Sequence, residues 1–122
     1  MKLRAAILSL ALALAAGVAT QAQEVSIGTG AVLRGLDKIN GTSVDLTLAA
    51  GESGALGKLT VTLQECRYPA GDAAADAFAF LTVTEPKVET PVFKGWMIAS
   101  SPALNAMQHA RYDVWVLRCR TE

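Results

Sequence analysis

The 122-residue sequence is poor in the side chains that most often perform catalysis or bind metal ions. It has one histidine, His109, and two cysteines, Cys66 and Cys119. These are too few for a closed structural zinc site, which takes four ligands. Its 11 Lys and Arg residues are balanced by 11 Asp and Glu residues, whereas a nucleic-acid-binding surface needs clustered Lys and Arg. We therefore expect no metal, no cofactor and no nucleic-acid partner.

Motifs of nucleotide-binding and catalytic sites are also missing. The stretch Gly28–Gly30 is followed by neither GK[ST] nor a helical pattern, so it is not a phosphate loop. Ser100 or Ser101 with His109 and Asp113 could supply the roles of a catalytic triad, but no Gly-x-Ser-x-Gly elbow is present. His109 and Asp113 are also expected on different elements. The sequence thus predicts that the protein is not an enzyme, and a small Ser/His hydrolase is the least favoured alternative.

The N-terminus has the order of features typical of a secretory signal peptide. Lys2 and Arg4 precede an apolar run over residues 5–16, and small residues follow up to Ala22. The run of about 12 residues is well short of the ~20 that a spanning helix needs. We expect export to the periplasm, cleavage after Ala22, and no transmembrane anchor afterwards.

Loss of this leader changes the composition of the remaining chain. Residues 1–22 are the predicted signal peptide, 23–32 a flexible N-terminal arm, and 33–122 a single β domain. Without the leader, 9 basic residues face 11 acidic ones, so the net charge is about −2. This charge also offers no polybasic patch for anionic lipid.

An even number of cysteines in a small exported domain favours a disulfide, because that compartment is oxidising. We expect a bond between Cys66 and Cys119, which would close a loop of about 53 residues and stabilise the fold by about 4 kcal/mol. Two buried free thiols are the alternative.

Alternating apolar and polar residues predict a chain made mostly of strands. Asn40–Gly41 has the composition of a tight turn, and the three glycines of 51–57 indicate a loop. Strict alternation would put Cys66 on the polar face of its strand, so a bulge or strand end is expected there. The residues 77–83 are apolar on both faces, as in a strand covered twice. Strands are expected at 33–39, 44–48, 59–63, 77–83 and 112–118, with one or two more within 88–98 around Pro91 and Gly95.

The last strand and one helical turn complete the expected fold. Ser101 is a good N-cap and Pro102 suits the first helical position, so a short helical turn should follow and end near His109. In the last strand, alternation places Trp115 on the face of Cys119, where it would pack beside the disulfide. The fold class is therefore all-β: a small sandwich or partly open barrel with one short helical turn and one disulfide.

The segment 93–102 is the candidate interaction surface. Aromatic residues and Met are enriched at protein interfaces. An alternative is that Trp96 and Ile98 face one side and pack in the core while Met97 fills a gap. The candidate surface residues are Phe93, Trp96, Met97, Ser100, Ser101 and Pro102.

Three stretches resemble a known family. They are GWMIASSPAL at 95–104, YDVWVLRC at 112–119 and LRGLDKING at 33–41. Together with the strand leading to Cys66, they are similar to an exported alphaproteobacterial family, domain of unknown function 2155. Ile98 departs from it, since an aromatic residue is expected there. The resemblance implies no assigned catalytic residues. Genes of this kind often lie beside an accessory subunit of respiratory NADH:ubiquinone oxidoreductase, complex I.

These observations predict a non-catalytic periplasmic accessory or interaction protein with a protein partner. The resemblance implies one candidate for that partner, the periplasmic face of respiratory complex I. A periplasmic ligand- or glycan-binding module is the alternative, and it would show an aromatic-lined cleft.

Overall fold

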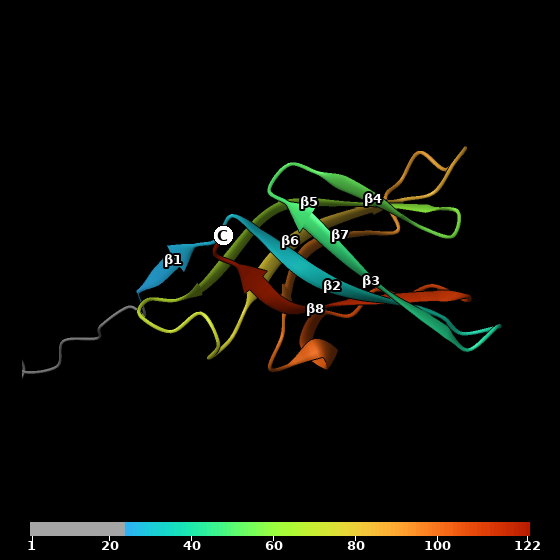
Figure 1. The fold of residues 1–122 in the computed structure, drawn as a ribbon. Helices are drawn as coiled ribbons and strands as arrows, with labels where there is room; N and C mark the ends of the chain where they lie inside the picture. Colours follow the sequence, from blue (N-terminus) through green and yellow to red (C-terminus); the bar gives the residue numbers. More distant parts are fainter. Residues whose placement is uncertain (1–23) are drawn as a thin grey trace, which may run out of the picture.

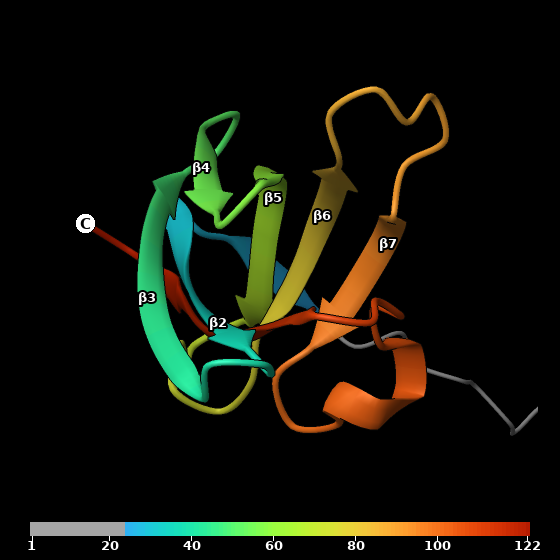
Figure 2. The ribbon, with the colours of Figure 1, turned by 90° about the vertical axis from the view of Figure 1, so that its right-hand side faces the viewer.

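The computed structural model describes residues 24–122, and the predicted signal peptide with its cleavage site after Ala22 lies outside this range. Two antiparallel sheets pack face to face (Figures 1 and 2). Because the described residues form two antiparallel sheets, the predicted all-β fold is confirmed. Neither sheet closes on itself, so of the two expected forms it is the sandwich. No helix within residues 24–122 is long and apolar enough to cross a membrane.

One sheet has five strands and the other has three. In the first, the order is β1-β5-β6-β7, and the short β4 pairs with β5 beyond β1. In the second, the order is β3-β2-β8. The elements are β1 (Val25–Ile27), β2 (Gly30–Asp37), β3 (Thr42–Ala49), β4 (Ser53–Leu56), β5 (Leu59–Pro69), β6 (Phe78–Thr84), β7 (Phe93–Ile98), the 3-10 turn η1 (Pro102–Asn105) and β8 (Tyr112–Arg120).

The hairpin of β2 and β3 confirms the predicted turn. The two strands pair from Gly30 with Ala49 to Asp37 with Thr42. Gly41 closes the turn with a φ of 69°, a left-handed conformation that glycine adopts without steric cost. Asp37 accepts hydrogen bonds from the backbone N–H groups of Ile39 and Asn40, so its side chain holds the turn together.

Three local expectations were wrong. The predicted flexible arm, 23–32, contains β1 and the start of β2, because Gly28 N–H donates to Cys66 O and Thr29 N–H to Arg120 O. The predicted loop 51–57 contains β4, which adds to the edge of β5. The predicted short helical turn does begin at Pro102, as a 3-10 turn, but the expected cap was wrong because Ser101 makes no side-chain capping bond, and the turn ends at Asn105 rather than near His109.

Both cysteine-bearing strands carry a bulge. In β5 the register shifts between Leu63 and Glu65, which confirms the irregularity expected before Cys66. In β8, Arg118 pairs with Val32 and Val116 with Leu33, so Leu117 is the extra residue. This second bulge was not predicted.

Because of the bulge at Leu117, the predicted position of Trp115 beside the disulfide was wrong. Val114 and Val116 point into the core, and the extra residue turns Cys119 to the same side. Trp115 therefore lies half-buried on the opposite, outer face and not beside the disulfide.

The core lies between the two sheets and is crossed by the predicted disulfide. Cys66 of β5 and Cys119 of β8 are bonded, with their Cα atoms 5.6 Å apart, so the bond joins one sheet to the other. The largest fully buried side chains of the core come from both sheets: Leu33, Leu59, Leu63, Leu81, Val61, Val83, Val114 and Val116.

Candidate interaction surface

The outer face of the five-stranded sheet carries a row of apolar side chains. Strand alternation buries Ala79, Leu81 and Val83 of β6, and it leaves the half-buried Phe78 and Phe80 on the other side. The register then places Phe80 beside Trp96 and Phe78 beside Ile98. We call this surface the apolar outer face; it consists of six apolar side chains and the one arginine that lies among them: Val25, Ile27, Phe78, Phe80, Trp96, Ile98 and Arg67.

Trp96 is held at the centre of the apolar outer face by two neighbours. Its ring meets the Phe80 ring edge-on, with centroids 5.2 Å apart and planes at 79°. The Arg67 guanidinium lies over the indole, with Cζ 4.9 Å from the ring centroid, in a cation–π arrangement. The tryptophan is thus held in a defined orientation, while a minor part of its surface stays exposed to solvent.

Glu65 fixes the orientation of Arg67. Arg67 Nε donates to Glu65 Oε1 at 2.8 Å and its second amino group donates to Oε2 at 3.1 Å. The hydrogen bond and the opposite charge lower the pKa of Glu65 and raise that of Arg67. A bidentate pair of this kind holds a guanidinium plane in a defined direction. Arg67 is therefore oriented as a cap over Trp96.

A shallow hollow of about 300 Å³ opens beside the tryptophan. Val25, Arg67, Phe78, Trp96 and Ile98 line it. Near it, Val25 is 43% exposed and Ile27 68% exposed, so these two aliphatic side chains extend the apolar surface beyond the hollow. A hollow of this composition can accept an apolar side chain, with the guanidinium at its rim.

The structure divides the predicted surface residues between three places. Phe93 and Met97 are core residues, 9% and 3% exposed, so their inclusion in an exposed surface was wrong. Trp96 is on the outer face because it alternates with them along β7, and Ile98 shares that face. Ser100 is exposed after β7, while Ser101 and Pro102 lie at the start of η1. Whether the outer face binds a partner stays a prediction.

Sequence reasoning missed most of the residues that surround Trp96. Phe78 and Phe80 were assigned to a strand covered on both faces, yet they alternate with the small Ala77 and Ala79. Large residues alternating with small ones indicate two unequal faces, and this signal was available. No signal in the sequence placed Arg67 over Trp96, because that contact depends on the bulge in β5.

Ser100 bonds to a carboxylate that orders the backbone. Its Oγ donates to Asp76 Oδ2 at 2.7 Å, and the N–H groups of Ser100 and Ala77 donate to Oδ1 at 3.0 and 2.9 Å. Burial raises the pKa of Asp76, but these three hydrogen bonds outweigh it and the net shift is downward. The arrangement ties the start of β6 to the end of β7.

His109 is likewise engaged with backbone. Its Nδ1 accepts from the N–H groups of Arg111 and Tyr112 at 3.0 and 3.1 Å, and its Nε2 lies 3.6 Å from Glu85 Oε2. Asp113 accepts from the N–H of Val114. Within residues 24–122, no hydrogen bond joins His109 to Ser100, Ser101 or Asp113, so the candidate triad is not assembled. The same range holds no group of three or more His, Cys, Asp or Glu residues placed to bind a metal ion.

Comparison with known proteins gives a family and one relative. Residues 31–119 match the family described as "Uncharacterized protein conserved in bacteria (DUF2155)". The protein named "Uncharacterized protein RP359" of Rickettsia prowazekii (strain Madrid E) is 32% identical over 87 residues, which cover 69% of this chain. The match spans 56% of that relative's length. No solved structure matches the chain. The predicted resemblance is confirmed: the chain belongs to the DUF2155 family.

Proposed function

We propose that this chain is a non-catalytic periplasmic accessory protein that docks on a partner protein through the apolar outer face. The observation that carries the proposal is the ordered, partly exposed Trp96 between Phe80 and Arg67. Tryptophan and arginine are the residues most enriched among those that dominate binding energy at interfaces.

The geometry of this surface favours binding energetically. An interface residue that must be ordered on binding costs about 0.5–1.5 kcal/mol of conformational entropy. Trp96 is already ordered by Phe80, and Arg67 by Glu65, so a partner would lose less of its binding energy to ordering these side chains. The surrounding aliphatic side chains Val25, Ile27 and Ile98 would then exclude water around them.

The partner we propose is the periplasmic face of respiratory complex I. Support for it comes from the gene neighbourhood that the family resemblance implies. A surface with a central aromatic anchor and no assembled triad fits an accessory subunit better than it fits an enzyme.

The test is retention of the chain on a complex purified from gently solubilised membranes. Complex I subunits should co-purify with the affinity-tagged chain and be identified by mass spectrometry. Trp96→Ala removes the central side chain and should weaken retention by at least about tenfold, since residues of this type contribute about 2 kcal/mol or more. Trp115→Ala is the matched control, because Trp115 is also half-buried but lies on the outer face of the other sheet. It should leave retention unchanged.

Two results would count against the proposal. Absence of the chain from a mildly solubilised complex I would exclude that partner. Equal loss of retention in Trp96→Ala and Trp115→Ala would remove the outer face as the docking surface and indicate general destabilisation.

A periplasmic glycan-binding module is the second candidate, and the hollow beside Trp96 is the observation that favours it. An aromatic wall with one arginine at the rim suits the apolar face of a sugar ring. Cell-wall fragments should then raise the thermal unfolding temperature of the wild type and not that of Trp96→Ala. The hydrolase alternative predicts a loss of function in His109→Ala, and an unchanged phenotype would remove it.

A further inference from the structure

The arginines among residues 24–122 fall into two groups. Of the five among residues 24–122, three are neutralised at short distance: Arg34 by Asp45 at 2.8 Å, Arg67 by Glu65 at 2.8 Å and Arg111 by Asp37 at 2.9 Å. Arg118 and Arg120 have no carboxylate of the described residues within 4.0 Å. Neither guanidinium is neutralised at short distance, so both charges are available to a ligand.

These two arginines share one face because of the local strand geometry. After the bulge at Leu117, Arg118 pairs with Val32 and Arg120 pairs with Gly30, so both side chains leave the outer face of β8. Cys119 between them points inward into the disulfide. Backbone bonds hold the strand end as well, since Thr29 N–H donates to Arg120 O. The pair is therefore anchored on rigid backbone.

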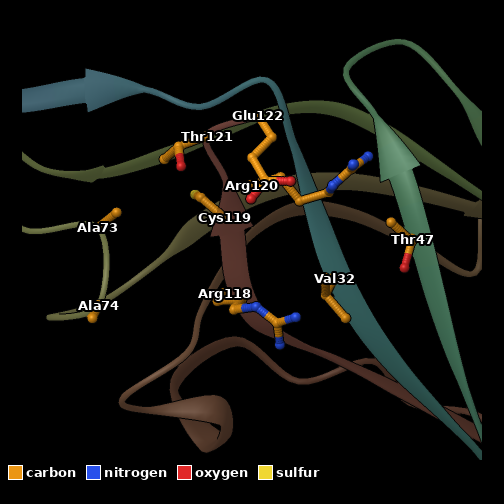
Figure 3. A pocket seen from close by; sticks show the side chains of 9 residues that line it. All are labelled: Val32, Thr47, Ala73, Ala74, Arg118, Cys119, Arg120, Thr121 and Glu122. Carbon is orange, nitrogen blue, oxygen red and sulfur yellow. The ribbon is translucent and has the colours of Figure 1, made fainter.

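A pocket of about 340 Å³ lies at this position (Figure 3). Val32 and Thr47 stand on one side of β8 and Ala73 and Ala74 on the other, as Figure 3 shows. These side chains are small, and Gly30 beside Arg120 adds none. The remaining lining residues are Arg118, Cys119, Arg120, Thr121 and Glu122.

We propose that this pocket binds a phosphate group, carried by a small soluble ligand or by a lipid headgroup. Guanidinium groups match phosphate oxygens with paired, charge-assisted hydrogen bonds. The hydroxyls of Thr47 and Thr121 can add neutral donors. The volume is at the small end of ligand pockets, which suits a phosphate with a small attached group. Glu122 is the one acidic residue in the lining, and its negative charge opposes the anion.

The neighbouring acid does not cancel the two arginines. Asp45 of β3 is hydrogen-bonded by Arg34 through both carboxylate oxygens, at 2.8 and 3.1 Å. That hydrogen bond is the main cause of its lowered pKa, and Arg118 adds a smaller Coulombic contribution. The charge of Asp45 is thus already balanced by Arg34, and Arg118 remains available to a ligand.

Titration of the full chain with inorganic phosphate, followed by amide NMR shifts, tests the site. Shifts should centre on Thr47, Arg118 and Thr121. The double variant Arg118→Gln/Arg120→Gln should weaken binding by about tenfold or more, because each hydrogen bond to a charged group is lost. The variant Lys58→Gln/Lys94→Gln makes the same change in net charge at exposed sites outside the pocket lining and should leave the affinity unchanged.

A vesicle assay separates the two sources of the phosphate. Three results together would assign a lipid headgroup. The chain would cosediment with phosphatidylglycerol vesicles, it would not cosediment with phosphatidylcholine vesicles, and the Arg118→Gln/Arg120→Gln variant would lose the binding. Binding of phosphate without vesicle binding would assign a soluble ligand. Glu122→Gln should tighten either interaction. The proposal is overturned if neither probe binds, or if the lysine control loses as much affinity as the arginine variant.

Discussion

Removal of the disulfide is expected to cost this domain a large part of its stability. The change is Cys66→Ala with Cys119→Ala, which deletes the covalent link between β5 and β8. The bond closes a loop with a sequence separation of 53 residues. In the chain-entropy description, a loop of that length stabilises the folded state by about 4 kcal/mol.

Packing adds to this loss. Cys66 is fully buried and Cys119 is 5% exposed, so alanine leaves two sulfur-sized spaces in the core. Each lost group of about methylene size costs about 0.8 kcal/mol. The free energy of unfolding should therefore fall by about 5–6 kcal/mol, out of the 5–15 kcal/mol typical of a domain of this size.

Urea unfolding of three forms separates the contribution of the covalent link from that of packing. The forms are the oxidised wild type, the reduced wild type and the double variant. Reduced wild type loses the link but keeps both sulfur atoms, so it should lie between the other two. The dependence of the free energy on urea concentration should rise in both unlinked forms, since their unfolded chains expose more surface. A loss below about 2 kcal/mol in the double variant, with the wild-type fold retained, would refute the loop-entropy reasoning.

Three further perturbations test other parts of the fold. Gly28→Ala should lower the free energy of unfolding by about 1–3 kcal/mol in chemical denaturation, because an added Cβ would lie 2.7 Å from Arg120 O and 3.1 Å from Cys119 Cβ; wild-type stability would contradict this packing. Asp37→Asn should lower the melting temperature at pH 7, because the pKa of Asp37 is lowered mainly by its hydrogen bond from Arg111. That contribution is present above the ordinary aspartate pKa of 3.8 and is lost as pH falls through the lower folded value, so the difference between variant and wild type should shrink with acid; a constant difference would exclude the ion pair as its cause. Deletion of Leu117 should still allow the disulfide to form, because it removes the extra residue and leaves Cys119 facing inward; alkylation showing two free thiols would contradict that register.

Strand positions could be predicted because burial on one face imposes a period of two on the sequence. The β2–β3 hairpin shows this best: its alternation and its Asn40–Gly41 turn both specify the same register. The short β4 could not be predicted from its sequence, because Ser53–Leu56 has little alternation of its own and is a strand only through pairing with β5.

The two bulges show why the irregularity before Cys66 could be predicted while the face of Trp115 was predicted wrongly. In β5, strict alternation would have put Cys66 on the polar face, and this conflict pointed to an irregularity. In β8, alternation put Cys119 on the same face as Trp115 and Leu117, which are both apolar, so no conflict was visible. A bulge is detectable from sequence only where it restores a pattern that is otherwise broken.

The candidate surfaces depend on the same irregularities. The shift in β5 turns Cys66 inward and Arg67 outward over Trp96, and the shift in β8 turns Cys119 inward with Arg118 and Arg120 outward. One face of the sandwich is thereby apolar around a tryptophan, and the other has two unpaired arginines. Because the faces lie on different sheets and share no lining residue, substitutions on one should not alter binding at the other. Loss of the disulfide should weaken both, since it anchors the strand segment on which each surface depends.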